Sequence, residues 1–544
     1  MGKTGLFVVS NPSRIRRFLP VIQKHVQNTL YVQFTPSRSN LVPSSSQKNE
    51  TFLTPPHHSQ TVIKLYSQTA VSNHNLDVRV LLSAFRDPLL SSISTRKKIE
   101  VVFFDRTYNN DEVHRFVKSC LSNVTQSCEI VTLNDASTND KEDEEVESPR
   151  DNFYVKTSQH NIMNNKTLKV YDNVVLGGTF DRLHLGHRII LSEAVLHCTK
   201  RITVGVTDTP MLQSKKLWEL IAPCCKRMSS VEDFLNDVEP NLEYNVVPIT
   251  DPYGPTRTDP TLQMIVVSAE TYKGGLKVND LRRENGLSQL DIHTVELLEP
   301  LCGVSHPEEE LKISSSNERM RLLGTQLKPP EPNPLIPNHP YIIGLTGNIA
   351  SGKSSVAGRL EKLGAGVIVC DKLAHELYCK GGPCYDGMRQ LFGDGILDSQ
   401  GEVDRKAVGS IVFNDKEKLQ SLNELLWPAM LIVIKERAQE MYRAGKEVVI
   451  VEAAVLLQAN WDKHCHEVWT CLISPEESVK RLQSRNNLSE SDAKARLSNQ
   501  TANTELVEKS NVVFCTLWSP EFTQVQVNKA WTQLQQFLHG DAKQ

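Results

Sequence analysis

Short runs of β-branched and other apolar residues alternate along the chain with longer amphipathic stretches. The runs that predict strands are Leu6–Val9, Leu30–Phe34, Val174–Leu176, Ile202–Val206, Ile265–Ser268, Tyr341–Leu345, Val448–Val451 and Val468–Leu472. This alternation favours α/β units around a parallel sheet. Because ligands of such folds bind at the C-terminal ends of the strands, functional residues are expected directly after them.

Three segments interrupt the pattern and predict domain boundaries. Residues 36–60 are rich in Ser, Pro and Asn and predict a loop. Residues 139–151 carry seven acidic and two basic side chains, a self-repelling block that predicts a linker. Residues 328–340 contain six prolines and predict a stiff, extended spacer. The expected parts are an N-terminal domain 1–138, an acidic linker 139–167, a middle module 168–327, a proline-rich linker 328–340 and a C-terminal module 341–544.

Length and composition limit the classes of protein. The 544 residues suggest roughly three domains. The net charge of -3 lacks the excess of positive charge that is typical of a dedicated nucleic-acid-binding protein, so no nucleic-acid partner is expected. The 12 cysteines are scattered without a CxxC pair, which favours reduced thiols over a disulfide scaffold or a thiolate zinc site. No apolar run is long enough to predict a transmembrane helix.

The N-terminus has an asymmetric charge. Residues 1–49 contain no Asp or Glu, and their basic residues are Lys3, Arg14, Arg16, Arg17, Lys24, Arg38 and Lys48. Basic, acid-poor starts act as mitochondrial addresses, whereas the two predicted strands in this segment favour an ordinary folded domain. We expect a cytoplasmic protein, with import into mitochondria or peripheral association with their membrane as a hypothesis for this segment.

The most specific motif lies in residues 344–356, GLTGNIASGKSSV. Gly347-x-x-x-x-Gly352-Lys353-Ser354 matches the P-loop pattern between a predicted strand and a predicted helix. Its glycines let backbone amides turn toward phosphate oxygens, Lys353 reaches the β- and γ-phosphates, and Ser354 ligates Mg²⁺. The predicted ATP-binding residues are Gly347, Asn348, Ile349, Ala350, Ser351, Gly352, Lys353, Ser354 and Ser355, with Ser354 as the metal ligand.

Two features downstream of the P-loop suit phosphoryl transfer. The predicted strand Gly366–Cys370 ends at Asp371, a carboxylate suited to accept a proton from an attacking hydroxyl. Arg481 and Arg485 lie one helical turn apart and are suited to close over the transferring phosphoryl group. A solvated basic helix face is the alternative interpretation of this pair.

The C-terminal module resembles the dephospho-CoA kinase family. The resemblance rests on the P-loop and on CDKLAHELY at 370–378, FGDGILDSQGEVDRKAVGSIVF at 392–413 and VKRLQSRNNLSESDAKARLSNQ at 479–500. It implies that Asp371 is the base for a ribose 3′-hydroxyl and that Arg481 and Arg485 face the phosphates. The catalytic candidates are Lys353, Asp371 and Arg481, with Arg485 as a nucleotide-binding candidate. The chain departs from the family pattern at three positions. It has Val369-Cys-Asp371 where the family has DxD, Trp427-Pro428 where the family has His-Pro, and Gln458 where the family has an acidic residue.

A second phosphate-binding pattern follows the strand at Val174–Leu176. Gly177, Gly178, Thr179 and Phe180 lead into His184-x-Gly186-His187 at the start of a predicted helix. Paired glycines permit close backbone approach, and two histidines near a helix N-terminus suit hydrogen bonding to phosphate oxygens. Such a site would stabilise the charge of a transition state at an α-phosphorus. Metal ligation, or two ordinary core or surface histidines, are the alternatives.

The string TFDxxHxGH resembles the HxGH nucleotidyltransferase superfamily. Lys215-Lys216, Asp251–Pro255, Val266–Thr271 and Ile313–Ser316 narrow the resemblance to phosphopantetheine adenylyltransferases. It implies that the two histidines face a triphosphate and that Lys215 or Lys216 meets phosphates of both substrates. For the serines near 314, a helix cap is an alternative to ligand binding. The catalytic candidates are His184, His187 and Lys216, and the nucleotide-binding candidates are Gly177, Gly178, Thr179, Phe180, Lys215, Ser314, Ser315 and Arg319.

Together the resemblances imply an α/β chain. A Rossmann-like HxGH nucleotidyltransferase domain is followed by a P-loop kinase domain with a parallel sheet, and an N-terminal α/β-like domain precedes both. The order resembles that of bifunctional coenzyme A synthases and implies the substrates 4′-phosphopantetheine, dephospho-CoA and ATP, with Mg²⁺. The rival hypotheses are a dephospho-CoA kinase with a non-catalytic first module and a P-loop signalling switch. Neither an oligomeric state nor a role for residues 1–138 is predicted.

Overall fold

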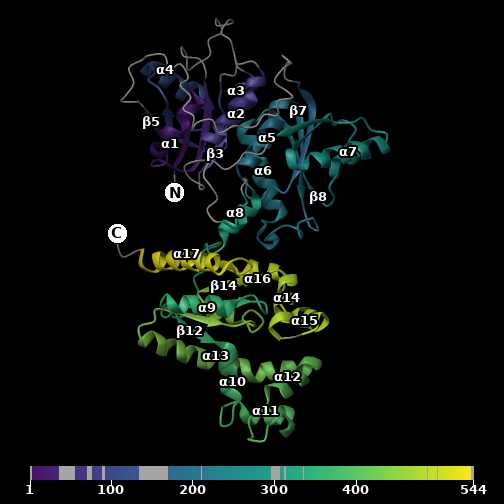
Figure 1. Ribbon diagram of the computed structural model, residues 1–544. Coiled ribbons are helices and arrows are strands. Elements are labelled where there is room, and N and C mark those ends of the chain that lie inside the picture. The colour runs from purple at the N-terminus through teal and green to yellow at the C-terminus, as the bar shows by residue number, and fades with distance from the viewer. Residues whose placement is uncertain are drawn as a thin grey trace. The chain divides into compact units, whose positions relative to one another are not determined.

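Three parallel β-sheets, each with five strands, organise the chain in the computed structural model (Figure 1). The structure describes residues 3–35, 55–69, 76–87, 92–133, 169–209, 211–295, 307–310, 314–334, 336–486, 488–498 and 500–540. The chain divides into two units, Met1–Glu318 with the first two sheets and Arg319–Gln544 with the third. The predicted acidic linker lies outside the described residues. Among the described helices, none has the length and apolar character that crossing a membrane requires.

The first sheet has the strand order β3-β2-β1-β4-β5. Its strands are β1 (Lys3–Val9), β2 (Val26–Phe34), β3 (Asp77–Val80), β4 (Ile99–Phe104) and β5 (Val124–Thr132). The helices are α1 (Ile15–Ile22), α2 (Pro55–Thr69), α3 (Ser83–Arg86) and α4 (Asn110–Arg115). Leu6 and Val8 pack on one face, and Phe7 and Val9 pack on the other. The continuous apolar runs therefore reflect burial on both faces.

One expectation for the N-terminal region changes with this sheet. The predicted loop 36–60 is wrong at its end, because α2 begins at Pro55. Helix α2 is seated by buried apolar side chains, including Val62 and Leu65, which outweigh the local proline and serine content. The basic start of the chain contributes β1 and β2 to the sheet core. Deleting residues 1–30 would therefore remove buried strands, so that deletion tests folding as well as localisation.

The second sheet has the order β10-β9-β6-β7-β8 and carries the HxGH motif. Its strands are β6 (Tyr171–Gly178), β7 (Cys198–Thr207), β8 (Glu243–Ile249), β9 (Met264–Ser268) and β10 (Asp291–Val295). The helices are α5 (Leu185–His197), α6 (Cys224–Val238) and α7 (Tyr272–Glu284), and α8 (Ser315–Leu322) contains the boundary between the two units. The chain runs outward from β6 in both directions, so the strand order reverses beside β6, where α/β folds bind ligands.

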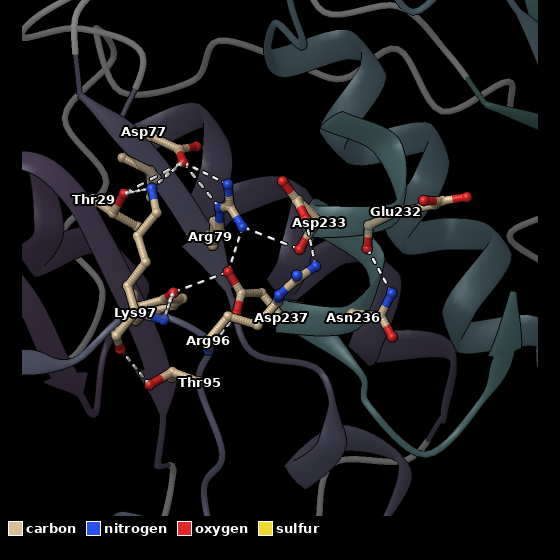
Figure 2. Close-up of polar contacts among 12 residues, drawn as sticks. Thr29, Asp77, Arg79, Thr95, Arg96, Lys97, Glu232, Asp233, Asn236 and Asp237 are labelled. Carbon is tan, nitrogen blue, oxygen red and sulfur yellow. Dashed lines mark hydrogen bonds and ion pairs between the residues drawn. The ribbon is translucent and has the colours of Figure 1, made fainter. Parts of the chain in front are cut away.

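The first two sheets share one hydrophobic core and a polar joint. The core extends from α1, α2 and β1 to α5, α6 and β6. Figure 2 shows the joint, in which Arg79 of β3 lies between Asp77 on its own strand and Asp237 of α6. Arg96 pairs with Asp233 of α6 as well. Because Asp237 and Arg79 are both buried, removing Arg79 would leave Asp237 as an uncompensated charge, which typically costs about 3–5 kcal/mol.

The third sheet has the order β12-β13-β11-β14-β15. Its strands are β11 (Tyr341–Gly347), β12 (Gly366–Val369), β13 (Val448–Glu452), β14 (Glu467–Leu472) and β15 (Val512–Cys515). The helices are α9 (Lys353–Lys362), α10 (Cys370–Tyr378), α11 (Tyr385–Phe392), α12 (Arg405–Asn414), α13 (Lys416–Arg443), α14 (Pro475–Asn486), α15 (Glu490–Ser498), α16 (Asn503–Lys509) and α17 (Pro520–His539). Helices α9 and α17 cover one face of the sheet and α13 covers the other (Figure 1).

The proline-rich segment 328–340 does not run free. The Lys328 ammonium donates to the Glu508 carbonyl at 2.7 Å, and the Asn333 amide donates to the Lys463 carbonyl at 2.9 Å. His466 Nε2 lies 3.2 Å from the Pro337 carbonyl oxygen. The described part of the segment is therefore attached to the second unit, and the prediction of a spacer is wrong in this respect.

Candidate nucleotide-binding sites

The P-loop joins β11 to α9 in the backbone conformation that its glycines permit. Gly347 has a φ of 139°, and a Cβ there would lie 2.3 Å from the Cys471 carbonyl oxygen. Gly352 has a φ of 89°, and its Cβ would lie 2.7 Å from Thr516. The loop is held from outside as well, because Gln500 accepts a hydrogen bond from the Ile349 amide at 2.8 Å. The loop from Gly347 to Gly352 is therefore preformed.

Lys353 lies in the first turn of α9 and folds back over the loop. Its ammonium donates to the Gly347 carbonyl at 2.9 Å and to the Asn348 carbonyl at 3.1 Å. Burial lowers the pKa of Lys353, although Cys471, Glu452 and Asp371 oppose this effect. The side chain is thus a partly desolvated cation beside the backbone carbonyls of the loop.

Glu452 is a site residue that the sequence patterns did not single out. It ends β13, in register with Leu345 of β11, and is 7% exposed. Ser354 Oγ donates to its Oε1 at 2.7 Å. The other carboxylate oxygen, Oε2, is shielded from solvent and has no hydrogen-bond partner among the described residues. The sequence does contain a signal for Glu452, because the apolar run Val448–Val451 is followed directly by this acidic residue. Such a strand with a carboxylate at its end resembles the one that holds Mg²⁺ in P-loop enzymes.

The predicted charged residues downstream lie around Lys353 and the loop. Arg481 of α14 donates to the Ala350 carbonyl at 3.2 Å and to Thr516 Oγ1 at 2.8 Å. Asp371, in the first turn of α10, and Arg485, in the last turn of α14, are exposed, and both act electrostatically on Lys353. Ser351 is buried within the loop, and Ser355 is exposed on the first turn of α9.

A cleft of about 790 Å³ opens beside the P-loop in the second unit. Its wall includes Ile349 of the loop, Gln500, and two positions that depart from the family pattern, Trp427 and Gln458. Gln458 donates from its amide to Thr501 Oγ1 at 3.5 Å. The cleft has the size of a small-molecule site, and its lining combines apolar side chains with polar and charged ones.

The HxGH motif spans the turn from β6 into α5. The His184 and His187 rings stack with their centroids 3.8 Å apart. A Cβ at Gly186 would lie 3.3 Å from the His184 imidazole, so glycine leaves room for the first ring. His184 Nε2 lies 3.2 Å from Ser315 Oγ. The structure therefore brings together two histidines and one predicted serine.

His187 is held in its neutral form. Burial holds its pKa well below the usual range, and the positive charges of His184, Arg188 and Lys215 add to this effect. Its Nδ1 is shielded from solvent and has no hydrogen-bond partner among the described residues. The neighbouring Arg188 is anchored to the first sheet by an ion pair of 2.9 Å with Asp77. The histidine pair therefore begins a helix that the N-terminal domain helps to hold.

The other predicted residues of this site occupy the strand ends and α8. Gly177 and Gly178 end β6, and Arg227 of α6 donates to the Thr179 carbonyl at 2.6 Å. Ser314 Oγ accepts from the Asn317 amide at 3.3 Å, so this serine caps α8. Of the remaining predicted residues, Phe180 is buried with a φ of 50°. Lys215 and Lys216 lie in the turn after β7. Arg319 is buried on α8, beyond the boundary between the units.

The two sites define a nucleotide-dependent transferase with a P-loop domain. The family model described as dephospho-CoA kinase matches residues 341–516, and the model described as cytidylyltransferase-like matches residues 175–321. The dephospho-CoA kinase of Moorella thermoacetica is 36% identical over 202 residues, which cover 37% of this chain and 95% of that protein. The dephospho-CoA kinase of Geobacter sulfurreducens is 38% identical over 190 residues, covering 35% and 96%. A solved dephospho-CoA kinase from Campylobacter jejuni is 26% identical, covers 36% of this chain and 97% of its own, and has a TM-score of 0.27.

The chain therefore belongs to the dephospho-CoA kinase family, through its C-terminal domain. A cytidylyltransferase-like domain precedes that domain in the same chain. This combination is consistent with a bifunctional coenzyme A synthase.

Proposed function

We propose that the chain catalyses two consecutive reactions. The first transfers AMP from ATP to 4′-phosphopantetheine, giving dephospho-CoA and pyrophosphate. The second transfers the γ-phosphoryl group of another ATP to the 3′-hydroxyl of that product, giving CoA and ADP. The observation that carries the proposal is that each domain has its own phosphate-binding turn with its side chains gathered, namely His184 and His187 in one and Lys353 and Ser354 in the other.

In the first reaction the substrate supplies its own nucleophile. A 4′-phosphate oxygen attacks the α-phosphorus of ATP, the bond to the β-phosphate oxygen breaks, and pyrophosphate leaves. The protein then has to orient the phosphates and stabilise the developing charge. The stacked histidines at the N-terminus of α5 and the Lys215 charge near His187 suit this task. Lys216 stays a candidate for the same phosphates.

In the second reaction the 3′-hydroxyl loses a proton as it attacks the γ-phosphorus. Asp371 is the proposed base, because it is the carboxylate after β12 whose charge acts on Lys353. Lys353 would then exchange its loop carbonyl partners for phosphate oxygens, and Arg481 would stabilise the equatorial oxygens from the α14 side. The cleft lined by Trp427 and Gln458 suits the acceptor, since it borders the same loop.

Magnesium fits the P-loop site. The Ser354 hydroxyl and the unpartnered Oε2 of Glu452 are oxygen donors of the kind that Mg²⁺ prefers, and they lie beside the predicted phosphates. The bound ion would neutralise part of the charge of the β- and γ-phosphates. We therefore propose Ser354 as a metal ligand and Glu452 as its carboxylate partner.

Replacing Glu452 by glutamine tests that assignment. We expect kcat of the kinase step to fall about 10²-fold and its Mg²⁺ requirement to rise, because the amide keeps an acceptor for Ser354 but removes the charge. Adenylyl transfer in the same protein should be unchanged. The matched control is Glu447→Gln, directly before the first residue of β13, which should alter neither activity. Equal kinase rates and Mg²⁺ profiles for Glu452→Gln and wild type would rule out the carboxylate's role.

The adenylyltransferase half is tested by pyrophosphate release. Purified full-length protein with MgATP should release pyrophosphate only when 4′-phosphopantetheine is added. CoA formation from supplied dephospho-CoA, measured in parallel, confirms that the preparation is active. Kinase activity without acceptor-dependent pyrophosphate release would favour the rival hypothesis of a non-catalytic first module.

A further inference from the structure

Three metal-ligating side chains meet inside the second sheet domain, apart from both phosphate-binding turns. Glu193 and His197 lie one turn apart at the end of α5, and His293 lies on the edge strand β10. Glu193 Oε2 is 3.1 Å from His293 Nε2 and 3.8 Å from His197 Nε2. One atom of each residue lies within 4.8 Å of the other two. The three groups therefore converge on one point.

Two of the three side chains are buried, and the cluster is short of positive charge. Glu193 is 2% exposed and His197 is 7% exposed. Within the described part of the chain, the ion-pair partners of Glu193 are the two histidines, with no lysine or arginine among them. Glu193 Oε1 and His197 Nε2 are shielded from solvent and have no hydrogen-bond partner among the same residues. A buried carboxylate in this setting is strongly unfavourable unless a cation or a proton balances it.

Neighbouring groups orient two of these side chains as they do for metal ligands. His197 Nδ1 lies 2.9 Å from the Lys169 carbonyl oxygen, and because a carbonyl only accepts, Nδ1 carries the proton. With the proton on Nδ1, the Nε2 atom of a neutral ring carries a lone pair, and it lies 3.8 Å from Glu193 Oε2. Ser59 Oγ of α2 donates to Glu193 Oε2 at 2.9 Å. Such outer hydrogen bonds fix the tautomer of a ligating histidine and the direction of a ligating carboxylate.

We propose that Glu193, His197 and His293 bind one zinc-class divalent transition-metal ion. Tetrahedral zinc holds its ligands at about 2.0–2.1 Å, which separates ligand atoms by about 3.3–3.5 Å, and the two Glu193 distances bracket that value. Two imidazoles disfavour Mg²⁺, the ion that the kinase site requires. Because Ser59 comes from the N-terminal domain, the ion stabilises the contact between α2 and α5.

The test uses Co²⁺ as the probe on the metal-stripped full-length protein, in the presence of excess Mg²⁺. Wild type should bind one equivalent with the visible d–d bands of four-coordinate Co²⁺, and Zn²⁺ should displace it. Zn²⁺ alone should also raise the unfolding temperature, because an ion that binds only the folded state stabilises it. Absence of these bands in wild type overturns the proposal, and this result needs no variant.

Two histidine variants locate the ion. His293→Gln should lose the Co²⁺ bands and the Zn²⁺-induced rise in unfolding temperature, and it is the milder change because this side chain is 31% exposed. The matched control is His184→Gln, which alters the stacked pair of His184 and His187 at the start of α5 and should keep both signals. Bands retained in His293→Gln, or lost in His184→Gln alone, place the ion elsewhere and overturn the proposal.

Discussion

Replacing Lys353 by alanine is expected to reduce phosphorylation of dephospho-CoA by about 10²–10³-fold, with adenylyl transfer unchanged. The ammonium is the one P-loop side chain that already lies over the loop carbonyls, 2.9 Å from that of Gly347. In the proposed reaction it moves to the transferring phosphoryl group. Its loss should therefore raise the activation free energy of phosphoryl transfer more than it lowers the stability of the folded protein. The measurement is the initial rate of CoA formation from supplied dephospho-CoA and MgATP.

The same helix offers a matched control for this prediction. Lys362 lies at the other end of α9 and is exposed, so Lys362→Ala should keep the wild-type rate. Adenylyl transfer by Lys353→Ala reports whether the first unit is folded, and its unfolding temperature reports whether the P-loop domain is. A Lys353→Ala protein that forms CoA at the wild-type rate would contradict the assigned role of the P-loop.

Replacing His187 by alanine is expected to reduce formation of dephospho-CoA by about 10²–10³-fold and to leave the kinase step intact. The ring is neutral because burial holds its pKa well below the usual range, so it acts as a hydrogen-bonding group and not as a cation. Its removal also takes away the ring on which His184 stacks. The measurement is pyrophosphate release that depends on 4′-phosphopantetheine.

An exposed histidine of the same unit serves as the control. His114 lies on α4 in the N-terminal domain, and His114→Ala should release pyrophosphate at the wild-type rate. If His187→Ala loses both activities while its unfolding temperature stays at the wild-type value, the two sites are not separate and the account is wrong.

Local motifs were readable from the sequence because adjacent residues carry them. The P-loop needs its glycines, Lys353 and Ser354 at fixed spacing, and β11 and α9 form where the pattern predicts them. The HxGH turn is equally local, since His184, Gly186 and His187 lie within one turn. The apolar runs predicted most of the parallel strands, because strands buried on both faces read as continuous apolar segments.

Contacts between distant segments were not readable in the same way. Glu452 reaches Ser354 only because the strand order puts β13 beside β11. Likewise, Glu193 and His293 have no spacing signature, and β10 brings them together as the edge strand of the second sheet. The end of the predicted loop 36–60 is helical because buried side chains of α2 pack in the shared core. Tertiary packing, which single-sequence patterns do not contain, decided each case.

The central claim is that one chain performs both reactions in order. The measurement that tests it most directly is a mass-resolved time course with purified protein, MgATP and 4′-phosphopantetheine. The account predicts that dephospho-CoA rises first and CoA follows, and that His187→Ala forms CoA at the wild-type rate only when dephospho-CoA is supplied. Absence of dephospho-CoA and CoA from the wild-type reaction, in a preparation that converts supplied dephospho-CoA to CoA, would contradict it.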